Sequence, residues 1–136
     1  MKKIVFLFAF LLSLSTVFGQ TKTHKIVFQL ATGDTLVHKG LIRQLNNVLE
    51  YWPTAKIEVV IHNDAIGFMR NTESVVAKEV KEMQERGITF AVCKNTMKRK
   101  KLTEADILPA AVFVPVGIAE IVEKQEDGYA YIKAGY

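Results

Sequence analysis

The chain has 136 residues, which is enough for one domain with a buried core and too few for two. Apolar residues make up 49% of the chain and charged residues 24%, and this composition excludes a disordered protein. The formal net charge is +4 and falls to +2 without Lys2 and Lys3, which is too mild to indicate nucleic-acid binding as the main role.

The first nineteen residues have the layout of a secretory signal peptide. Lys2 and Lys3 precede an apolar run from 4 to 14, and Val17-Phe18-Gly19 resembles a cleavage site. A membrane anchor is the alternative, but the run is shorter than the roughly 20 residues that span a bilayer. The sequence therefore predicts a signal peptide over residues 1–19 and one domain over 20–136. We expect an exported protein, periplasmic or secreted, that has no membrane segment after cleavage.

Strand and helix patterns alternate along the first half of this domain. Lys25 to Ala31 is apolar and rich in β-branched residues, which predicts a buried strand. Residues 35–52 repeat apolar side chains at helical spacing and predict a helix that Pro53 closes. Residues 56–64 predict a second strand, and a short turn follows over 65–70.

The same alternation continues in the second half. Residues 71–87 predict a helix that Asn71 or Thr72 caps and Gly87 ends. A third strand over 88–93 leads into short helical turns over 95–108, where Thr103 and Asp106 fit a capping box. The remaining pattern predicts a strand over 110–117, a helix over 118–128 and a last short strand over 129–133.

This order of elements predicts a three-layer α/β sandwich with a mostly parallel, five-stranded sheet. The flavodoxin-like strand order 2-1-3-4-5 is common at this size, and we expect it here. Ligands bind such sheets beyond the carboxyl ends of the strands. In that order the turn Thr32-Gly33-Asp34 would neighbour the end of the third strand.

Cys93 is the single cysteine and closes the third strand at this edge. It has no internal disulfide partner, although export usually leads to an oxidising compartment. The basic run Lys94, Lys98, Arg99, Lys100 and Lys101 and a helical turn from Asn95 both favour a thiolate, so we expect a reactive, solvent-accessible thiol. The alternatives are a buried cysteine that packs as a small hydrophobe and a basic run that is only a solvated turn.

Other residues are expected beside this thiol. His62 closes the second strand and could orient or deprotonate Cys93. Gly117 follows the fourth strand and opens a helix whose N–H groups could receive an anion. Lys94, Asn95 and Thr96 complete the candidate substrate-binding residues. One cysteine and scattered histidines do not form a zinc site, and no cofactor motif is present.

Three segments resemble one known family: "KIEVVIHNDAIGFM", "GITFAVCKNTM" and "ADILPAAVFVPVGIAEIVEKQEDGYAYIKAG". The chain is similar to the exported branch of the DsrE/DsrF-like sulfur-relay family. The resemblance implies a homo-oligomer, a trimer or a hexamer, and a cysteine, here Cys93, that accepts sulfur as a persulfide from an unknown donor. Two positions depart from the family pattern, because Lys94 and Asn63 stand where glycine is usual.

Three functional hypotheses follow. The first is a sulfur carrier or sulfurtransferase-like protein that uses Cys93. The second is a non-catalytic oligomeric binding module in which Cys93 only shapes a pocket. A thiol redox protein is the third, and the lack of a second cysteine counts against it.

Overall fold

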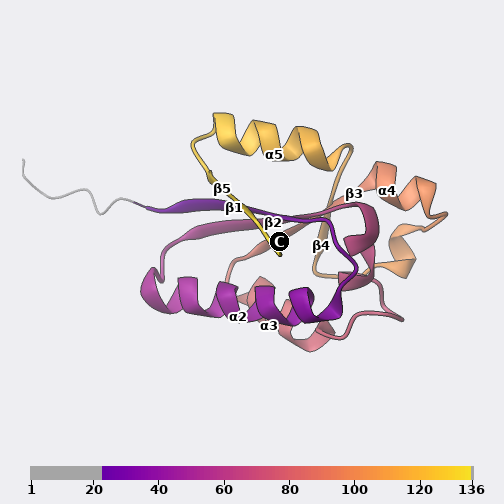
Figure 1. Ribbon diagram of the computed structural model, residues 1–136, viewed down its shortest axis with the longest axis horizontal. Coiled ribbons are helices and arrows are strands. Elements are labelled where there is room, and N and C mark those ends of the chain that lie inside the picture. The colour runs from indigo at the N-terminus through magenta and orange to yellow at the C-terminus, as the bar shows by residue number, and fades with distance from the viewer. Residues whose placement is uncertain (1–22, 136) are drawn as a thin grey trace, which may run out of the picture.

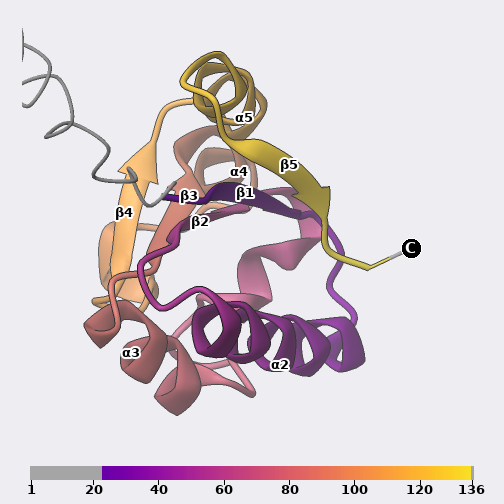
Figure 2. The same cartoon turned by 90° about the vertical axis from the view of Figure 1, so that its left-hand side faces the viewer.

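Five parallel strands form the middle layer of the fold (Figure 1). The structure, a computed structural model, describes residues 23–135, so the expected signal peptide over 1–19 lies outside the described residues. Helices cover both faces of the sheet, with α2 and α3 on one face and α5 on the other (Figure 2). The predicted three-layer α/β class with a parallel five-stranded sheet is confirmed.

The elements follow the predicted alternation. The strands are β1 (Lys25–Leu30), β2 (Lys56–Ile61), β3 (Thr89–Cys93), β4 (Ala111–Val114) and β5 (Ala130–Lys133). The α-helices are α2 (Thr35–Tyr51), α3 (Ala77–Glu85), α4 (Lys94–Arg99) and α5 (Gly117–Glu126). Two 3₁₀ helices, η1 (Asn63–Phe68) and η2 (Glu104–Asp106), lie in the connections after β2 and α4.

The strand order is β4-β3-β2-β1-β5, so the expected order 2-1-3-4-5 is wrong. That order needs the chain to reverse after its second strand. Here the chain steps in one direction from β1 to β4 and then crosses back with α5 to place β5 beside β1. Because parallel crossovers are right-handed, the reversal puts α5 on the face opposite α2 and α3. The neighbours of β3 are therefore β2 and β4, and the turn after β1 is not beside Cys93.

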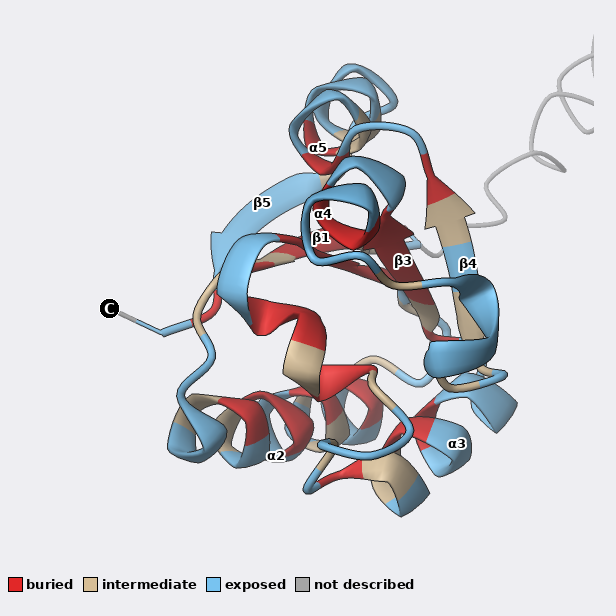
Figure 3. Ribbon diagram, turned by 90° about the vertical axis from the view of Figure 1, so that its right-hand side faces the viewer, coloured by how far each residue is buried: buried red, intermediate tan, exposed pale blue. Residues whose placement is uncertain are grey.

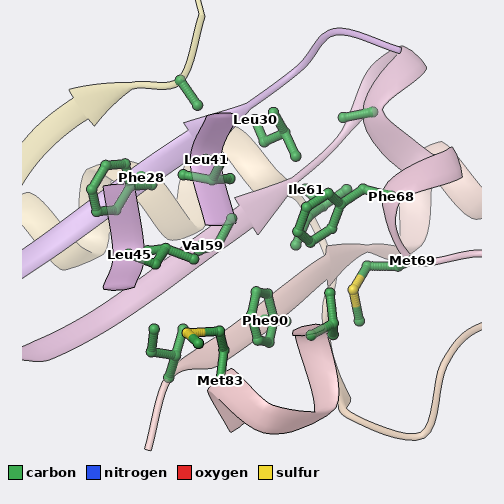
Figure 4. Close-up of a cluster of buried hydrophobic side chains, with 14 of the residues drawn as sticks. Phe28, Leu30, Leu41, Leu45, Val59, Ile61, Phe68, Met69, Met83 and Phe90 are labelled. Atoms are coloured by element: carbon green, nitrogen blue, oxygen red, sulfur yellow. The ribbon is translucent and has the colours of Figure 1, made fainter. Parts of the chain in front are cut away.

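The core is divided unequally between the two faces. Alternate residues of the strands point to α2 and α3, where they form the large apolar cluster shown in Figure 4, which includes Phe28, Val59 and Phe90. The cluster beneath α5 is much smaller. It consists of Val27, Val60, Ala91, Val114 and Ile121, with Tyr129 packed against it. Helix α5 is thus held by far fewer apolar contacts than α2.

The connection before α3 differs from the predicted one. The helix starts at Ala77 and not near residue 71, so Asn71 and Thr72 do not cap it. The backbone N–H and the side chain of Asn71 instead donate to the carbonyl oxygens of Asp106 and Ala105, which ties this segment to η2. The capping box of Thr103 and Asp106 is confirmed.

Within residues 23–135, no helix is both long enough and apolar enough to cross a bilayer.

Candidate functional site

Three strand ends meet at one corner of the carboxyl edge. Cys93 ends β3, His62 directly follows β2, and Gly117 begins α5 just after β4. A Cβ atom added to Gly117 would lie 3.2 Å from Cβ of His62 and 3.3 Å from Cβ of Cys93. Glycine at position 117 is therefore what allows α5 to start directly against the thiol.

This corner is a switch point of the sheet. After β3 the chain passes to the α2 and α3 side, where Met97 and Ile107 enter the large apolar cluster. After β4 it passes to α5 on the other face. Figure 3 looks onto this edge, with α4 in front of the strand ends and α5 above them. Crevices of parallel sheets form where adjacent strands send the chain to opposite faces, so the topology itself positions a site here.

A small cavity opens at the corner. Its volume is about 160 Å³. The residues that line it are His62, Asn63, Cys93, Asn95, Thr96, Arg99, Val116, Gly117 and Ile118. Pockets that bury a drug-sized ligand usually measure about 300–1,000 Å³, so this cavity suits a group of only a few atoms.

The Cys93 thiol is buried and surrounded by hydrogen-bond donors. Its residue is only 4% exposed, less than we expected of a reactive thiol. The backbone N–H of Gly117 donates to Sγ at 3.3 Å. Burial alone would raise the pKa of the Cys93 thiol. Hydrogen bonds from the Gly117 N–H, from the hydroxyl and N–H of Thr96 and from the Asn95 N–H outweigh that effect and lower the pKa below its ordinary value.

The basic run does not account for this lowered pKa. The ammonium group of Lys94 pairs with Glu104 at 3.1 Å, and that of Lys100 pairs with Asp64 at 2.9 Å. Of the basic residues in this run, only Arg99 lines the cavity. The thiolate is favoured here by hydrogen bonds to sulfur, and the bond from the Gly117 N–H contributes most. Clustered positive charge is thus not among the causes of the lowered pKa, whereas the N–H groups of Asn95 and Thr96, in the expected helical turn after Cys93, are.

His62 is held by a polar chain that runs across the sheet. Its Nε2 accepts a hydrogen bond from Nε2 of Gln29 at 2.9 Å, and Oε1 of Gln29 accepts one from the Tyr131 hydroxyl. The ring proton of His62 therefore lies on Nδ1. Burial lowers the pKa of His62, which favours the neutral ring. With Nε2 already occupied, this arrangement favours an orienting role for His62 over a role as the base for Cys93.

Asn63 shows why one departure from the family pattern is tolerated. Its φ angle is +54°, in the left-handed region that favours glycine and, after glycine, asparagine. Its N–H donates to Oγ1 of Thr96 at 3.0 Å, and its side-chain oxygen accepts from Arg99 at 3.0 Å. Asn63 thus keeps the backbone turn and adds a partner that holds Arg99 at the cavity.

The structure brings most of the candidate residues together. Cys93, His62, Asn95, Thr96 and Gly117 line the cavity, whereas Lys94 does not. Gln29 and the apolar lip formed by Val116 and Ile118 were not predicted from the sequence. A signal for Gln29 was available, because it is the one uncharged polar residue within the apolar strand "KIVFQL".

Among residues 23–135, no cluster of three or more histidine, cysteine or acidic side chains could hold a metal ion.

Comparisons with known proteins agree on the family and the fold. The model of the DsrE/DsrF-like family matches residues 16–134. A solved structure from Methanobacterium thermoautotrophicum, a protein of unknown function, has a TM-score of 0.78 at 27% identity and pairs 81% of this chain with 98% of that one. A conserved protein of unknown function from Bacteroides thetaiotaomicron has a TM-score of 0.65 at 18% identity, over 80% of this chain and 93% of that one. No protein of curated function matches the sequence.

Proposed function

Since the chain belongs to the DsrE/DsrF-like family, we propose that it is a sulfur carrier that accepts one sulfur atom on Cys93 as a persulfide. The observation that carries the proposal is the N–H of Gly117 aimed at Sγ at 3.3 Å, at the start of α5. This contact stabilises the thiolate, which is the form that attacks sulfur. It also stabilises the same thiolate when it leaves again.

The proposed transfer of a sulfur atom needs no added oxidant. The Cys93 thiolate attacks the terminal sulfur of a donor persulfide or polysulfide. A new S–S bond forms at Sγ, the old S–S bond breaks, and its electron pair leaves with the donor as a thiolate. A recipient thiolate then attacks the terminal sulfur of the Cys93 persulfide, and Cys93 leaves as a thiolate. A lowered thiol pKa assists this second step, because a more acidic thiol is a better leaving group.

The dimensions of the site also support a carrier. A cavity of about 160 Å³ accommodates an added sulfur atom and the end of a donor chain, whereas an organic cofactor needs more room. Val116 and Ile118 are 40% and 52% exposed and form an apolar lip beside the cavity. A donor or recipient thiol could approach across this lip.

A mass measurement tests the proposal. The purified, reduced protein is exposed to inorganic polysulfide, freed of excess reagent and analysed by intact-mass spectrometry. We expect a gain of one sulfur atom that dithiothreitol removes, and no gain in Cys93→Ser. An unchanged mass in the wild-type protein, together with an ordinary thiol titration, would contradict the carrier function.

That negative outcome would favour the second candidate, a non-catalytic oligomeric binding module. The observation on its side is the low exposure of Cys93, which also suits a cysteine that only packs. The two candidates differ in the chemistry of sulfur and not in the fold, so the mass gain separates them.

We further propose that the protein is exported, with cleavage after residue 19. Support comes from the basic start, apolar run and cleavage-like end of the N-terminal segment. Sequencing the N-terminus of the mature protein checks this, and an uncut chain in the membrane fraction would contradict it.

A further inference from the structure

Helix α5 lies lengthwise over β1 and β2 and runs against the strand direction (Figure 1). Residues 58, 60 and 62 share the strand face that points to α5, since strand side chains alternate. On the helix, residues 117, 121 and 124 form one stripe at helical spacing. Val60 lies under the start of α5, and Ile121 packs with it in the small apolar cluster. The helix and strand therefore meet in a defined lengthwise register.

The two ends of this contact are polar. At one end the N–H of Gly117 donates to the Cys93 thiol at 3.3 Å. At the other end the ammonium group of Lys124 pairs with Oε2 of Glu58 at 2.8 Å. The seven helix steps from Gly117 to Lys124 cover about 10 Å, so the two polar contacts lie near opposite ends of α5, one to β3 and the other to β2.

Apolar packing alone does little to fix this register. Gly117 and Ile121 are the buried residues that α5 contributes, and Ile118 and Val122 remain exposed on its outer side. A single aliphatic side chain resists rotation and sliding of a helix weakly, because apolar contacts are non-directional. An ion pair with a hydrogen bond at a fixed position is directional, so it can set the position that apolar contacts leave loose.

Burial of this ion pair also carries a desolvation penalty. Glu58 is 5% exposed, and its Oε1 has no hydrogen-bond partner among the described residues. Burial raises the pKa of the Glu58 carboxyl, and the hydrogen bond from Lys124 counteracts this effect. The Glu120 side chain lies 3.5 Å from the same ammonium group. Buried ion pairs contribute little to stability compared with apolar residues, so a role other than stability should be sought for this pair.

We infer that Glu58 and Lys124 are positioning residues for the Cys93 thiol: their ion pair fixes the lengthwise position of α5 on β2 and so keeps the Gly117 N–H at Sγ. The inference deepens the proposed function, since it rests on the thiol being the reactive group. The test measures the ionisation of the thiol and not its uptake of sulfur, so the inference and the proposed function can fail separately.

Other charged groups lie at both ends of the contact, and at the ion pair Lys56 and Arg86 line the same cavity as Glu58 and Lys124. His62 and Arg99 line the cavity at the thiol. At the ion pair, Glu120 shares the ammonium group, and the Tyr129 ring lies 5.4 Å from it. Lys124 lies seven residues along α5 from Gly117. Removal of its charge therefore affects the sulfur mainly by changing the position of α5.

The decisive variant is Lys124→Met, which keeps the aliphatic stem and removes the ammonium group. We expect the pH midpoint of Cys93 alkylation to move upward and the rate at pH 7 to fall roughly three- to tenfold, because part of a hydrogen bond to a charged sulfur is lost. The amide resonance of Gly117 in ¹⁵N spectra should also shift between wild type and variant, which reports directly on that hydrogen bond. Circular dichroism at each pH confirms that the variant is folded.

Two further variants serve as controls. Lys124→Arg retains the charge and supplies a second N–H for Oε1 of Glu58, so its alkylation profile should match the wild type. Lys78→Met removes an exposed lysine that pairs with Glu82 on α3, and it should change nothing at the thiol. If Lys124→Met does not fold, the neutral double variant Glu58→Gln/Lys124→Met takes its place, with the same expected direction.

A purely structural role gives a different result. Lys124→Met, or the double variant in its place, would then have a lower melting temperature but an unchanged alkylation midpoint and an unchanged Gly117 resonance. That outcome would overturn the inference and leave the sulfur-uptake test untouched.

Discussion

At the scale of single residues, Gly117 sets the chemistry of the site. A methyl group at this position would meet Cβ of His62, Cβ of Cys93 and a methyl carbon of Val60 at 3.2–3.3 Å. Such contacts are tighter than usual, so α5 or its neighbours must shift by a few tenths of an ångström, and we expect this shift to weaken the hydrogen bond from the Gly117 N–H to the sulfur. We predict that Gly117→Ala slows Cys93 alkylation at pH 7 by roughly tenfold and lowers the free energy of unfolding by about 1–3 kcal/mol.

The matched control is Gly40→Ala, the same chemical change in α2. A Cβ there meets only the end of the Arg43 side chain, at an ordinary 3.7 Å. Alkylation of Cys93 should stay at the wild-type rate in this variant. Equal alkylation profiles for Gly117→Ala and wild type would show that the close approach of α5 does not govern the thiol.

Some properties of the site residues could be predicted from sequence, and others could not. The place of Cys93 at the end of a strand follows from local pattern, and so does the place of Gly117 at the start of a helix. The hydrogen bonds from Asn95 and Thr96 that help to lower the thiol pKa are local as well, but the one from Gly117 is not. The Gly117 donor and the thiol are brought together by tertiary packing, whereas the adjacent lysines in the sequence turn away to acidic partners.

At the scale of elements, two glycines should respond in opposite ways to alanine. Gly40 lies inside α2 with ordinary space around it, so Gly40→Ala should raise the free energy of unfolding by about 0.5–1 kcal/mol. Gly87 follows α3 with a φ angle of +92° and open space around it. Gly87→Ala should lower that free energy by about 1–2 kcal/mol through backbone strain alone.

Urea denaturation of both variants and of wild type measures these changes. Because neither position touches the cavity, Cys93 alkylation serves as an internal control and should not change. A destabilised Gly40→Ala or an unaffected Gly87→Ala would mean that local backbone preference does not decide the ends and interiors of these helices.

The elements themselves were largely predictable, because strand and helix periodicities are local. The buried residues of α3, Val80 and Met83, lie three positions apart on one face, as the predicted helix requires. The start of α3 was not predictable, since Asn71 satisfies its hydrogen bonds with η2 and not at a helix end. The strand order was not predictable either. It depends on which face of the sheet each crossover covers, and the sequence of a single segment does not determine that face.

At the scale of the whole molecule, we propose that the protein forms homo-oligomers, a trimer or a multiple of one. Both edge strands and the outer side of α5 carry exposed apolar residues. These are Val112, Val116, Ile118, Val122, Tyr131 and Ile132. Contact between copies would cover at least part of this apolar surface. Light scattering at micromolar concentration should give a mass of three chains or a multiple of three.

Val122→Glu offers a variant for this prediction, since Val122 is 48% exposed and does not line the cavity. We expect a smaller particle, because a carboxylate is costly in an apolar interface. The exposed change Lys78→Met on α3 is the control. A monomeric wild-type protein would contradict the proposal. Tyr129 packs against the cluster beneath α5, so it is not offered as an interface residue.

The pairing of β1 with β5 determines when the sheet can be completed during folding. β1 is the first strand described and β5 the last, so the inner position of β1 exists only after nearly the whole chain is available. Until β5 docks, one edge of the apolar segment Lys25–Leu30 is open, and an unpaired edge of this kind invites pairing with other chains. The thiol corner, built from β2, β3, β4 and α5, does not depend on that last step except through the Tyr131–Gln29 link to His62. A chain cut short before β5 would thus keep the elements of its site while becoming prone to aggregate.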